Sequence, residues 1–142
     1  MNSKNTPILL VEDDPLDVEN IRRAFKAQGM ENKVYVASTG TMALDMLLGT
    51  SEEVLSPAPK IILLDLNLPG MGGLEVLQAI RANHALRSCS VFVMTSSHDE
   101  KDVLNAYDLN VAGYIVKPIQ YGSYTETVAT LNSFWELIEL PN

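Results

Sequence analysis

Short apolar runs alternate along the chain with segments in which apolar residues recur every three or four positions. The runs lack polar alternation, which is typical of strands in a parallel sheet that is covered on both faces. They predict five strands, at Ile8–Val11, Val34–Ala37, Ile61–Leu64, Val91–Met94 and Gly113–Val116. Each run is followed by helical periodicity. The pattern therefore predicts five βα units and an α/β fold with a doubly wound parallel sheet.

The helical segments are predicted from the spacing of their apolar residues and from the residues at their ends. Pro15 suits a first helical position, and Gly29 ends the same segment as a C-terminal cap would. Further helices are predicted over Thr41–Leu48, over a segment that begins with Leu74, Leu77 and Ile80, over Asp99–Asn110 and from Tyr124 to Ile138. The last of these is extended, with about five turns. The polar segment Ser51–Pro59 predicts a long surface loop.

The length of 142 residues fits one domain, with a core over about residues 7–133 and a C-terminal extension over about 134–142. No apolar run is longer than four residues, whereas a membrane span needs about 20. The segment Met1–Pro7 is polar and lacks the apolar stretch of a signal peptide. We therefore expect a cytoplasmic protein that does not bind membranes.

The net charge of the chain limits the classes of molecule that it is expected to bind. Ten Lys and Arg residues stand against eighteen Asp and Glu residues, which gives a net charge of −8. Such a surface repels phosphate backbones, so direct binding to nucleic acid is not expected. The lone cysteine, Cys89, excludes an intramolecular disulfide and a cysteine metal cluster. The carboxylates are partly clustered, however, and such a cluster is costly unless a cation offsets it.

Polar side chains follow four of the five predicted strands. The first strand is followed by Glu12 and Asp13, the third by Asp65, the fourth by Thr95 and the fifth by Lys117. The carboxyl ends of parallel strands meet at one edge of the sheet, where doubly wound proteins hold their functional crevice. We therefore expect three carboxylates, a hydroxyl group and an ammonium group to converge at this edge.

This combination of groups predicts a metal-assisted phosphoryl-transfer site. Like charges about 4 Å apart cost roughly 4 kcal/mol at an effective dielectric constant near 20, so Glu12, Asp13 and Asp65 favour a bound cation. Their oxygen ligands suit Mg²⁺, with Mn²⁺ as a substitute, and no His or Cys stands at these strand ends to favour zinc. In this interpretation, a phosphoryl group is held by the cation, the Thr95 hydroxyl and the Lys117 ammonium. Asp65 is the nucleophile that forms an acyl phosphate.

Four segments together make a specific pattern: Ile8–Asp14, Ile61–Gly70, Val93–Ser96 and Gly113–Pro118. In this pattern the chain resembles the receiver domain of bacterial two-component response regulators, which has a CheY-like, flavodoxin-like fold. The resemblance implies the strand order 2-1-3-4-5. It also implies a phospho-accepting signalling protein, not an enzyme that turns over outside substrates, with a sensor histidine kinase as its partner.

The resemblance implies roles for the acidic residues. Asp65 is the expected phospho-acceptor. Asp13 resembles a direct metal ligand, and Glu12 resembles its partner in the acidic pair, often acting through water. Asn67 matches the position whose backbone carbonyl completes the metal shell.

The resemblance also implies roles beyond the acidic cluster. Thr95 and Lys117 match the hydroxyl and the ammonium that bind the phosphoryl group. Tyr114 matches the aromatic switch residue, which turns inward when Thr95 is drawn to the phosphoryl group. The bond between Lys117 and Pro118 matches a cis peptide that aims Lys117 at the site.

The C-terminal part, together with two other segments, makes the resemblance more specific. The ending Ser133–Pro141, the loop Ser51–Pro59 and the run Thr95–Asp99 are similar to single-domain regulators that pair with phytochrome histidine kinases. Members of that group tend to form homodimers through the fourth helix, the fifth strand and the fifth helix. The candidate interface residues are Tyr121, Tyr124, Phe134 and Trp135. For the last two, packing within the chain is an equal alternative.

Three alternative functions compete with the receiver. A haloacid dehalogenase-type phosphatase needs a second Asp two residues after the nucleophile, where this chain has Asn67. A calcium loop of the EF-hand type that starts at Asp65 would need Glu at its twelfth position, where Val76 stands. A degenerate receiver that acts as a phosphorylation-independent binding scaffold stays open, because only phosphorylation chemistry excludes it.

Overall fold

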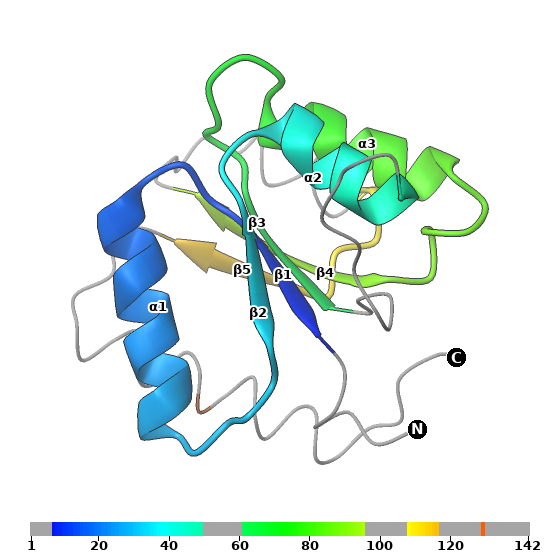
Figure 1. Ribbon diagram of the computed structural model, residues 1–142. Helices are drawn as coiled ribbons and strands as arrows, with labels where there is room; N and C mark the ends of the chain where they lie inside the picture. Colours follow the sequence, from blue (N-terminus) through cyan, green and yellow to red (C-terminus); the bar gives the residue numbers. More distant parts are fainter. Residues whose placement is uncertain (1–6, 50–60, 96–107, 117–128, 130–142) are drawn as a thin grey trace.

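The structure is a computed structural model in which residues 7–49, 61–95, 108–116 and 129 are described. Within these residues, five parallel strands form one sheet in the order β2-β1-β3-β4-β5 (Figure 1). The strands are β1 (Ile8–Val11), β2 (Val34–Ala37), β3 (Ile61–Asp65), β4 (Ser90–Thr95) and β5 (Gly113–Val116). The predicted sheet and its strand order are confirmed, and β3 and β4 extend slightly beyond their predicted bounds.

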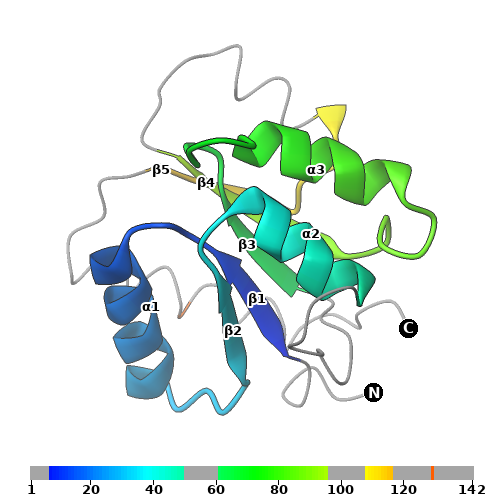
Figure 2. The same cartoon turned by 45° about the horizontal axis from the view of Figure 1, so that its top comes forward.

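Helices cover both faces of the sheet. Helix α1 (Pro15–Ala27) lies on one face, and α2 (Gly40–Leu48) and α3 (Gly73–Ala82) lie beside each other on the opposite face (Figures 1 and 2). Ile8 and Leu10 of β1 belong to the apolar cluster under α1, whereas the alternate β1 residues belong to the cluster under α2 and α3. Both sides of the strand are therefore buried, which explains its uninterrupted apolar sequence.

Helix α1 begins and ends at residues that favour those ends. The Asp14 side chain caps the helix by accepting a hydrogen bond from the Leu16 amide at 2.9 Å, and Pro15 occupies the first helical position. At the other end, Gly29 adopts a φ of +68° directly after the C-cap residue Gln28. A left-handed residue at this position ends the helix as a glycine C-cap motif does.

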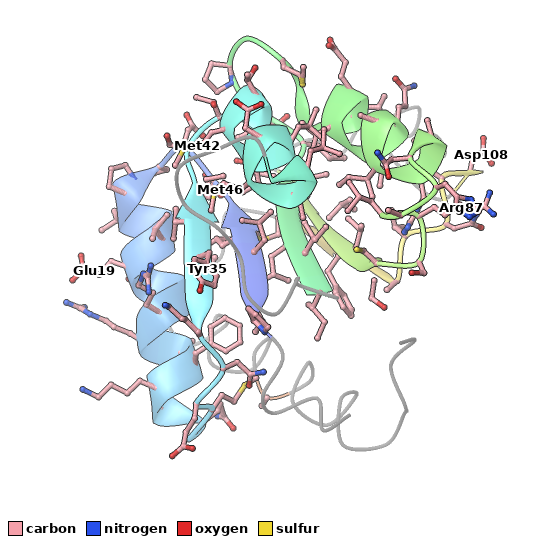
Figure 3. All side chains as sticks on the ribbon, turned by 45° about the vertical axis from the view of Figure 1, so that its right-hand side comes forward. Glu19, Tyr35, Met42, Met46, Arg87 and Asp108 are labelled. Atoms are coloured by element: carbon pink, nitrogen blue, oxygen red, sulfur yellow. The ribbon has the colours of Figure 1, made fainter. Side chains whose placement is uncertain are left out.

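Helices α2 and α3 bury one side each against the sheet. The Thr39 side chain caps α2 by accepting a hydrogen bond from the Met42 amide at 3.0 Å. Met46 of α2 lies between the helix and the sheet, where its side chain is 2% exposed, whereas Glu19 projects outward from α1 (Figure 3). Helix α3 buries Val76, Leu77 and Ile80 in the same cluster. The spacing of these residues matches the helical period expected from the sequence.

Several predictions concern residues outside the described ranges. These are the loop Ser51–Pro59, most of the predicted helix Asp99–Asn110, the last helix except residue 129, and the extension over about 134–142. The description of the chain as a single domain also stays a prediction. In the part of the chain that is described, no helix has the length and apolar character needed to cross a membrane.

Candidate functional site

Three carboxylates meet at the carboxyl edge of the sheet. Glu12 and Asp13 follow β1, and Asp65 is the last residue of β3. Strands β1 and β3 are paired so that Val11 lies opposite Leu64, which places Glu12 and Asp65 at the next position along the two strands. One oxygen from each of the three carboxylates lies within 4.8 Å of the others. The convergence predicted for these residues is confirmed.

The three carboxylates differ in their exposure to solvent. Glu12 is 1% exposed and Asp65 is 4% exposed, whereas Asp13 is exposed. Burial removes water that would otherwise solvate the two inner carboxylates, and their proximity adds repulsion between negative charges. A cation at this point stabilises the cluster by countering both costs.

Backbone amides orient the two buried carboxylates. The Asp14 amide donates a hydrogen bond to Glu12 Oε1 at 3.2 Å, and the Asn67 amide donates one to Asp65 Oδ1 at 2.8 Å. In both cases the donor lies two residues after the acceptor, so each carboxylate stabilises the turn that leaves its own strand. The same bonds fix the direction in which each carboxylate group lies.

The start of the loop after β3 is tied to the sheet. The Leu66 amide donates a hydrogen bond to the Met94 carbonyl of β4 at 2.8 Å. Asn67 comes next and is exposed at the edge of the cluster. This loop position is compatible with the prediction that the Asn67 backbone carbonyl is a ligand of the cation. The bond between this carbonyl and the cation stays a prediction.

The donor set fits a hard divalent cation. Three carboxylates within one small volume supply oxygen ligands, which Mg²⁺ and Mn²⁺ prefer. Among the described residues, this group includes no His or Cys ligand of the kind that favours zinc. The arrangement can hold a divalent cation next to the Asp65 carboxylate, where the cation would also lie close to a phosphoryl group on that side chain.

The backbone positions of two more predicted site residues are described. Asp65 pairs with Met94, so Thr95, the next residue, ends β4 at the same edge of the sheet as the carboxylates. Tyr114 pairs with Val93 between β4 and β5. The description covers the backbone of Thr95 and Tyr114 but not their side chains, so their roles as phosphoryl ligand and switch stay predictions.

The remaining predicted site residues lie outside the described residues. They are Lys117, Pro118, Tyr121, Tyr124, Phe134 and Trp135. The ammonium ligand, the cis peptide and the dimer interface therefore stay predictions.

Two glycines next to the site are not indicated by the sequence pattern. Gly40 begins α2 and Gly73 begins α3, and both are buried against the loop that follows Asp65. Neither glycine is a candidate site residue in the sequence analysis. A glycine before an amphipathic helix could have raised the possibility of a close backbone approach, but the sequence does not say which backbone approaches it.

Comparisons with known proteins agree with this geometry. The family described as "Response regulator receiver domain" matches residues 8–129. The chain is 36% identical to Response regulator Rcp1 of Synechocystis sp., over 99% of each chain.

Two solved structures extend the similarity to the fold. The phosphorylated cyanobacterial phytochrome response regulator RcpA has a TM-score of 0.89 and 32% identity, covering 97% of this chain and 99% of the other. The Mn²⁺-bound form of Rcp1 has a TM-score of 0.86 and 35% identity, covering 96% of this chain and 99% of the other. The similarity therefore includes a phosphorylated relative and a relative that binds a divalent cation.

Proposed function

The chain belongs to the response regulator receiver family, and we propose that Asp65 accepts a phosphoryl group from the phosphohistidine of a sensor histidine kinase. The observation that carries this proposal is the position of the buried Asp65 carboxylate, at the end of β3 and beside Glu12 and Asp13. Receiver domains are phospho-accepting signalling proteins. Catalysis by this one would be limited to its own phosphorylation and dephosphorylation.

In the proposed transfer, the bond that forms on Asp65 is matched by a bond that breaks on the kinase. An oxygen of Asp65 attacks the phosphorus atom, the bond between phosphorus and the kinase imidazole nitrogen breaks, and an acyl phosphate forms on Asp65. Water later attacks the acyl phosphate, which restores the carboxylate and releases inorganic phosphate. The hydrogen bond from the Asn67 amide to Asp65 Oδ1 holds the carboxylate in place before the reaction.

Mg²⁺ is the cation that we assign to the acidic cluster, with Mn²⁺ as a substitute. The proposed ligands are Glu12, Asp13, Asp65 and the backbone carbonyl of Asn67. The carboxylate donor set and the Mn²⁺-bound form of the relative Rcp1 support this assignment. When bound, the cation neutralises charge on the phosphoryl oxygens during transfer.

The proposal also assigns the phosphoryl-binding groups outside the acidic cluster. Thr95 and Lys117 bind the phosphoryl oxygens, and the bond between Lys117 and Pro118 is cis. Tyr114 reports the phosphorylated state by turning toward Thr95. Support comes from the match of these residues to the receiver pattern and from the position of Thr95 at the end of β4.

A phytochrome-type histidine kinase is the partner that we propose. The support is the similarity to a cyanobacterial phytochrome response regulator and to bacteriophytochrome response regulators, one of which is 39% identical over 95% of this chain. We propose that phosphorylation changes protein–protein contacts, including a homodimer through the fourth helix, β5 and the fifth helix. Tyr121, Tyr124, Phe134 and Trp135 contribute to this surface. A single receiver domain over 1–142 and a cytoplasmic location complete the proposal.

Intact-mass spectrometry after incubation with acetyl phosphate tests the function. We expect the protein to gain the mass of one phosphoryl group when Mg²⁺ is present and no mass when Mg²⁺ is removed. Asp65→Asn should abolish the gain. Asp14→Asn is the matched control, because Asp14 is an exposed carboxylate in the same region and Asn also caps helices well. An intact, folded protein that gains no mass would favour the binding-scaffold alternative.

A further inference from the structure

Two helices begin directly against the loop that follows Asp65. Helix α2 begins at Gly40 and α3 begins at Gly73, and the two helices pack beside each other on the same face of the sheet (Figures 1 and 2). Both glycines are buried. Neither has a positive φ, in contrast to Gly29, Gly49 and Gly70. Backbone conformation therefore does not explain why these two positions hold glycine.

Gly73 allows α3 to lie directly on the backbone of Asp65. A Cβ atom added at Gly73 would lie 2.5 Å from Leu66 Cα and 2.9 Å from the Asp65 carbonyl carbon, and closer still to the Asp65 carbonyl oxygen. All three atoms belong to the backbone, so they cannot move aside by a rotamer change. The Gly73 amide also donates a hydrogen bond to the Leu66 carbonyl at 3.3 Å.

Gly40 makes a similar close approach from α2. A Cβ atom added at Gly40 would lie 2.9 Å from the Met71 carbonyl oxygen and 2.6 Å from Val76 Cγ2. Met71 lies in the loop between Asp65 and α3, and Val76 is the fourth residue of α3. A methyl group at Gly40 would therefore push both the loop and α3 away from α2.

The loop can transmit such a displacement to the site. Its first residues are held by the hydrogen bonds from the Leu66 amide to the Met94 carbonyl and from the Asn67 amide to Asp65 Oδ1, each 2.8 Å long. Gly73 lies against these first residues, Asp65 and Leu66, and Gly40 lies against Met71 at the other end of the loop. The Asn67 backbone lies in the short segment between these two contacts, so we expect a shift of Leu66 or Met71 to displace it.

We propose that Gly40 and Gly73 form a glycine clamp, in which two helix starts hold the loop from Asp65 to Met71 in the geometry that binds the divalent cation. This inference builds on the proposed function, since it assumes a cation at the acidic cluster. The two glycines are positioning residues, because they act on the cation site through the backbone of the loop. Residues that orient metal ligands in this indirect way typically change metal affinity by about 10–100-fold when they are substituted.

The test compares Mn²⁺ affinity in three alanine variants, measured from the paramagnetic resonance signal of free Mn²⁺ at a temperature where circular dichroism shows each protein folded. Gly40→Ala should weaken Mn²⁺ binding about tenfold or more, and Gly73→Ala should weaken it further. Gly72→Ala is the matched control. An added Cβ at Gly72 would meet no atom within 4 Å, and the φ of −67° suits alanine.

A second variant keeps the test decisive if Gly40→Ala does not fold. Adding Val76→Ala to Gly40→Ala removes the side-chain overlap and leaves the overlap with the Met71 carbonyl. The double variant should still bind Mn²⁺ more weakly than Val76→Ala alone.

The possible outcomes distinguish a failure of the clamp from a failure of the proposed function. The clamp is wrong if the wild type binds Mn²⁺ and the folded Gly40→Ala variant binds it with the same affinity as the wild type. It is equally wrong if the double variant binds Mn²⁺ with the same affinity as Val76→Ala alone. It is also wrong if Gly72→Ala weakens binding as much as Gly40→Ala does. If the wild type neither binds Mn²⁺ nor gains a phosphoryl group, the proposed function itself fails and the clamp fails with it.

Discussion

Asn67 and Asp65 are joined by a hydrogen bond from the Asn67 amide to Asp65 Oδ1, while Asn67 itself is exposed. The hydrogen bond uses only the backbone of Asn67, so the side chain can be changed without removing the bond. The Asn67 side chain therefore offers a way to alter the surroundings of the proposed acyl phosphate while the carboxylate stays in place.

Asn67→Met should lengthen the lifetime of phosphorylated Asp65. A longer apolar side chain at this exposed position limits the access of water to the acyl phosphate, whereas the compact polar Asn admits it. The rate of inorganic phosphate release after removal of acetyl phosphate measures the lifetime. Mn²⁺ affinity serves as the control and should be unchanged, because the backbone carbonyl is retained. An equal rate of release in wild type and variant would show that this side chain does not control hydrolysis.

At the residue scale, the acidic cluster could be predicted from the sequence because it depends on a general property of parallel sheets. Each carboxylate follows an apolar run, and such runs end at one edge. Gly40 and Gly73 could not be predicted, because their effect depends on how closely two helices approach one loop. The role of Arg81 in α3 could not be predicted for a similar reason, since its guanidinium group donates hydrogen bonds to backbone carbonyls that the sequence does not identify as partners.

At the scale of elements, Arg81 of α3 joins three segments at the end of the sheet opposite the site. Its guanidinium group donates hydrogen bonds to the carbonyls of Arg87, Cys89, Leu109 and Asn110, at 2.6–2.9 Å. Arg87 and Asp108 lie near this end of α3 (Figure 3). Desolvation by burial lowers the pKa of Arg81, while the nearby Cys89 acts in the opposite direction. The four bonds tie α3 to the start of β4 and to the segment before β5.

Arg81→Met should lower the free energy of unfolding by about 2–4 kcal/mol, because it leaves the partly buried carbonyls of Cys89 and Leu109 without their charged donor. Arg81→Lys should recover only part of the loss, since an ammonium group cannot reach four carbonyls as the planar guanidinium does. Urea denaturation followed by circular dichroism measures both effects.

Arg23→Met is the matched control for Arg81. Arg23 forms an exposed ion pair with Glu19, and such pairs contribute about 0.5 kcal/mol or less. A loss for Arg81→Met no larger than that for Arg23→Met would contradict the structural role of Arg81.

The strands and the three described helices agree with the sequence pattern because local signals and tertiary packing coincide there. Asp14, Pro15 and Gly29 set the ends of α1, and Thr39 sets the start of α2. Helices α2 and α3 each begin one residue before their predicted starts, at Gly40 instead of Thr41 and at Gly73 instead of Leu74. Gly73 is a poor helix former, and it is helical because α3 packs against the loop at that residue.

At the scale of the whole molecule, the chain has a net charge of −8 and brings three of its carboxylates together at one edge of the sheet. Helices cover both faces of this sheet. A phosphoryl group added there alters charge at the point where β1, β3 and β4 end. In the proposed function, Thr95 and Tyr114 couple this change to the surface formed by the fourth helix, β5 and the fifth helix.

Phosphorylation should therefore change self-association. Analytical ultracentrifugation with and without acetyl phosphate and Mg²⁺ should give different dissociation constants for the dimer. Asp65→Asn should show the same constant in both conditions, and Asp14→Asn should behave as the wild type does. Identical constants for the phosphorylated and unphosphorylated wild type would show that the signal is not carried by the homodimer.

The central claim is that Asp65, among the three clustered carboxylates, forms the acyl phosphate. The most direct measurement is peptide mapping by mass spectrometry after incubation with acetyl phosphate and Mg²⁺ and rapid reduction with borohydride. Borohydride converts a phosphorylated aspartate into homoserine and leaves free carboxylates unchanged. We predict homoserine at position 65 and unmodified Glu12 and Asp13. Reduction at Asp13 instead, or no reduced residue in a protein that has gained a phosphoryl group, would contradict the account.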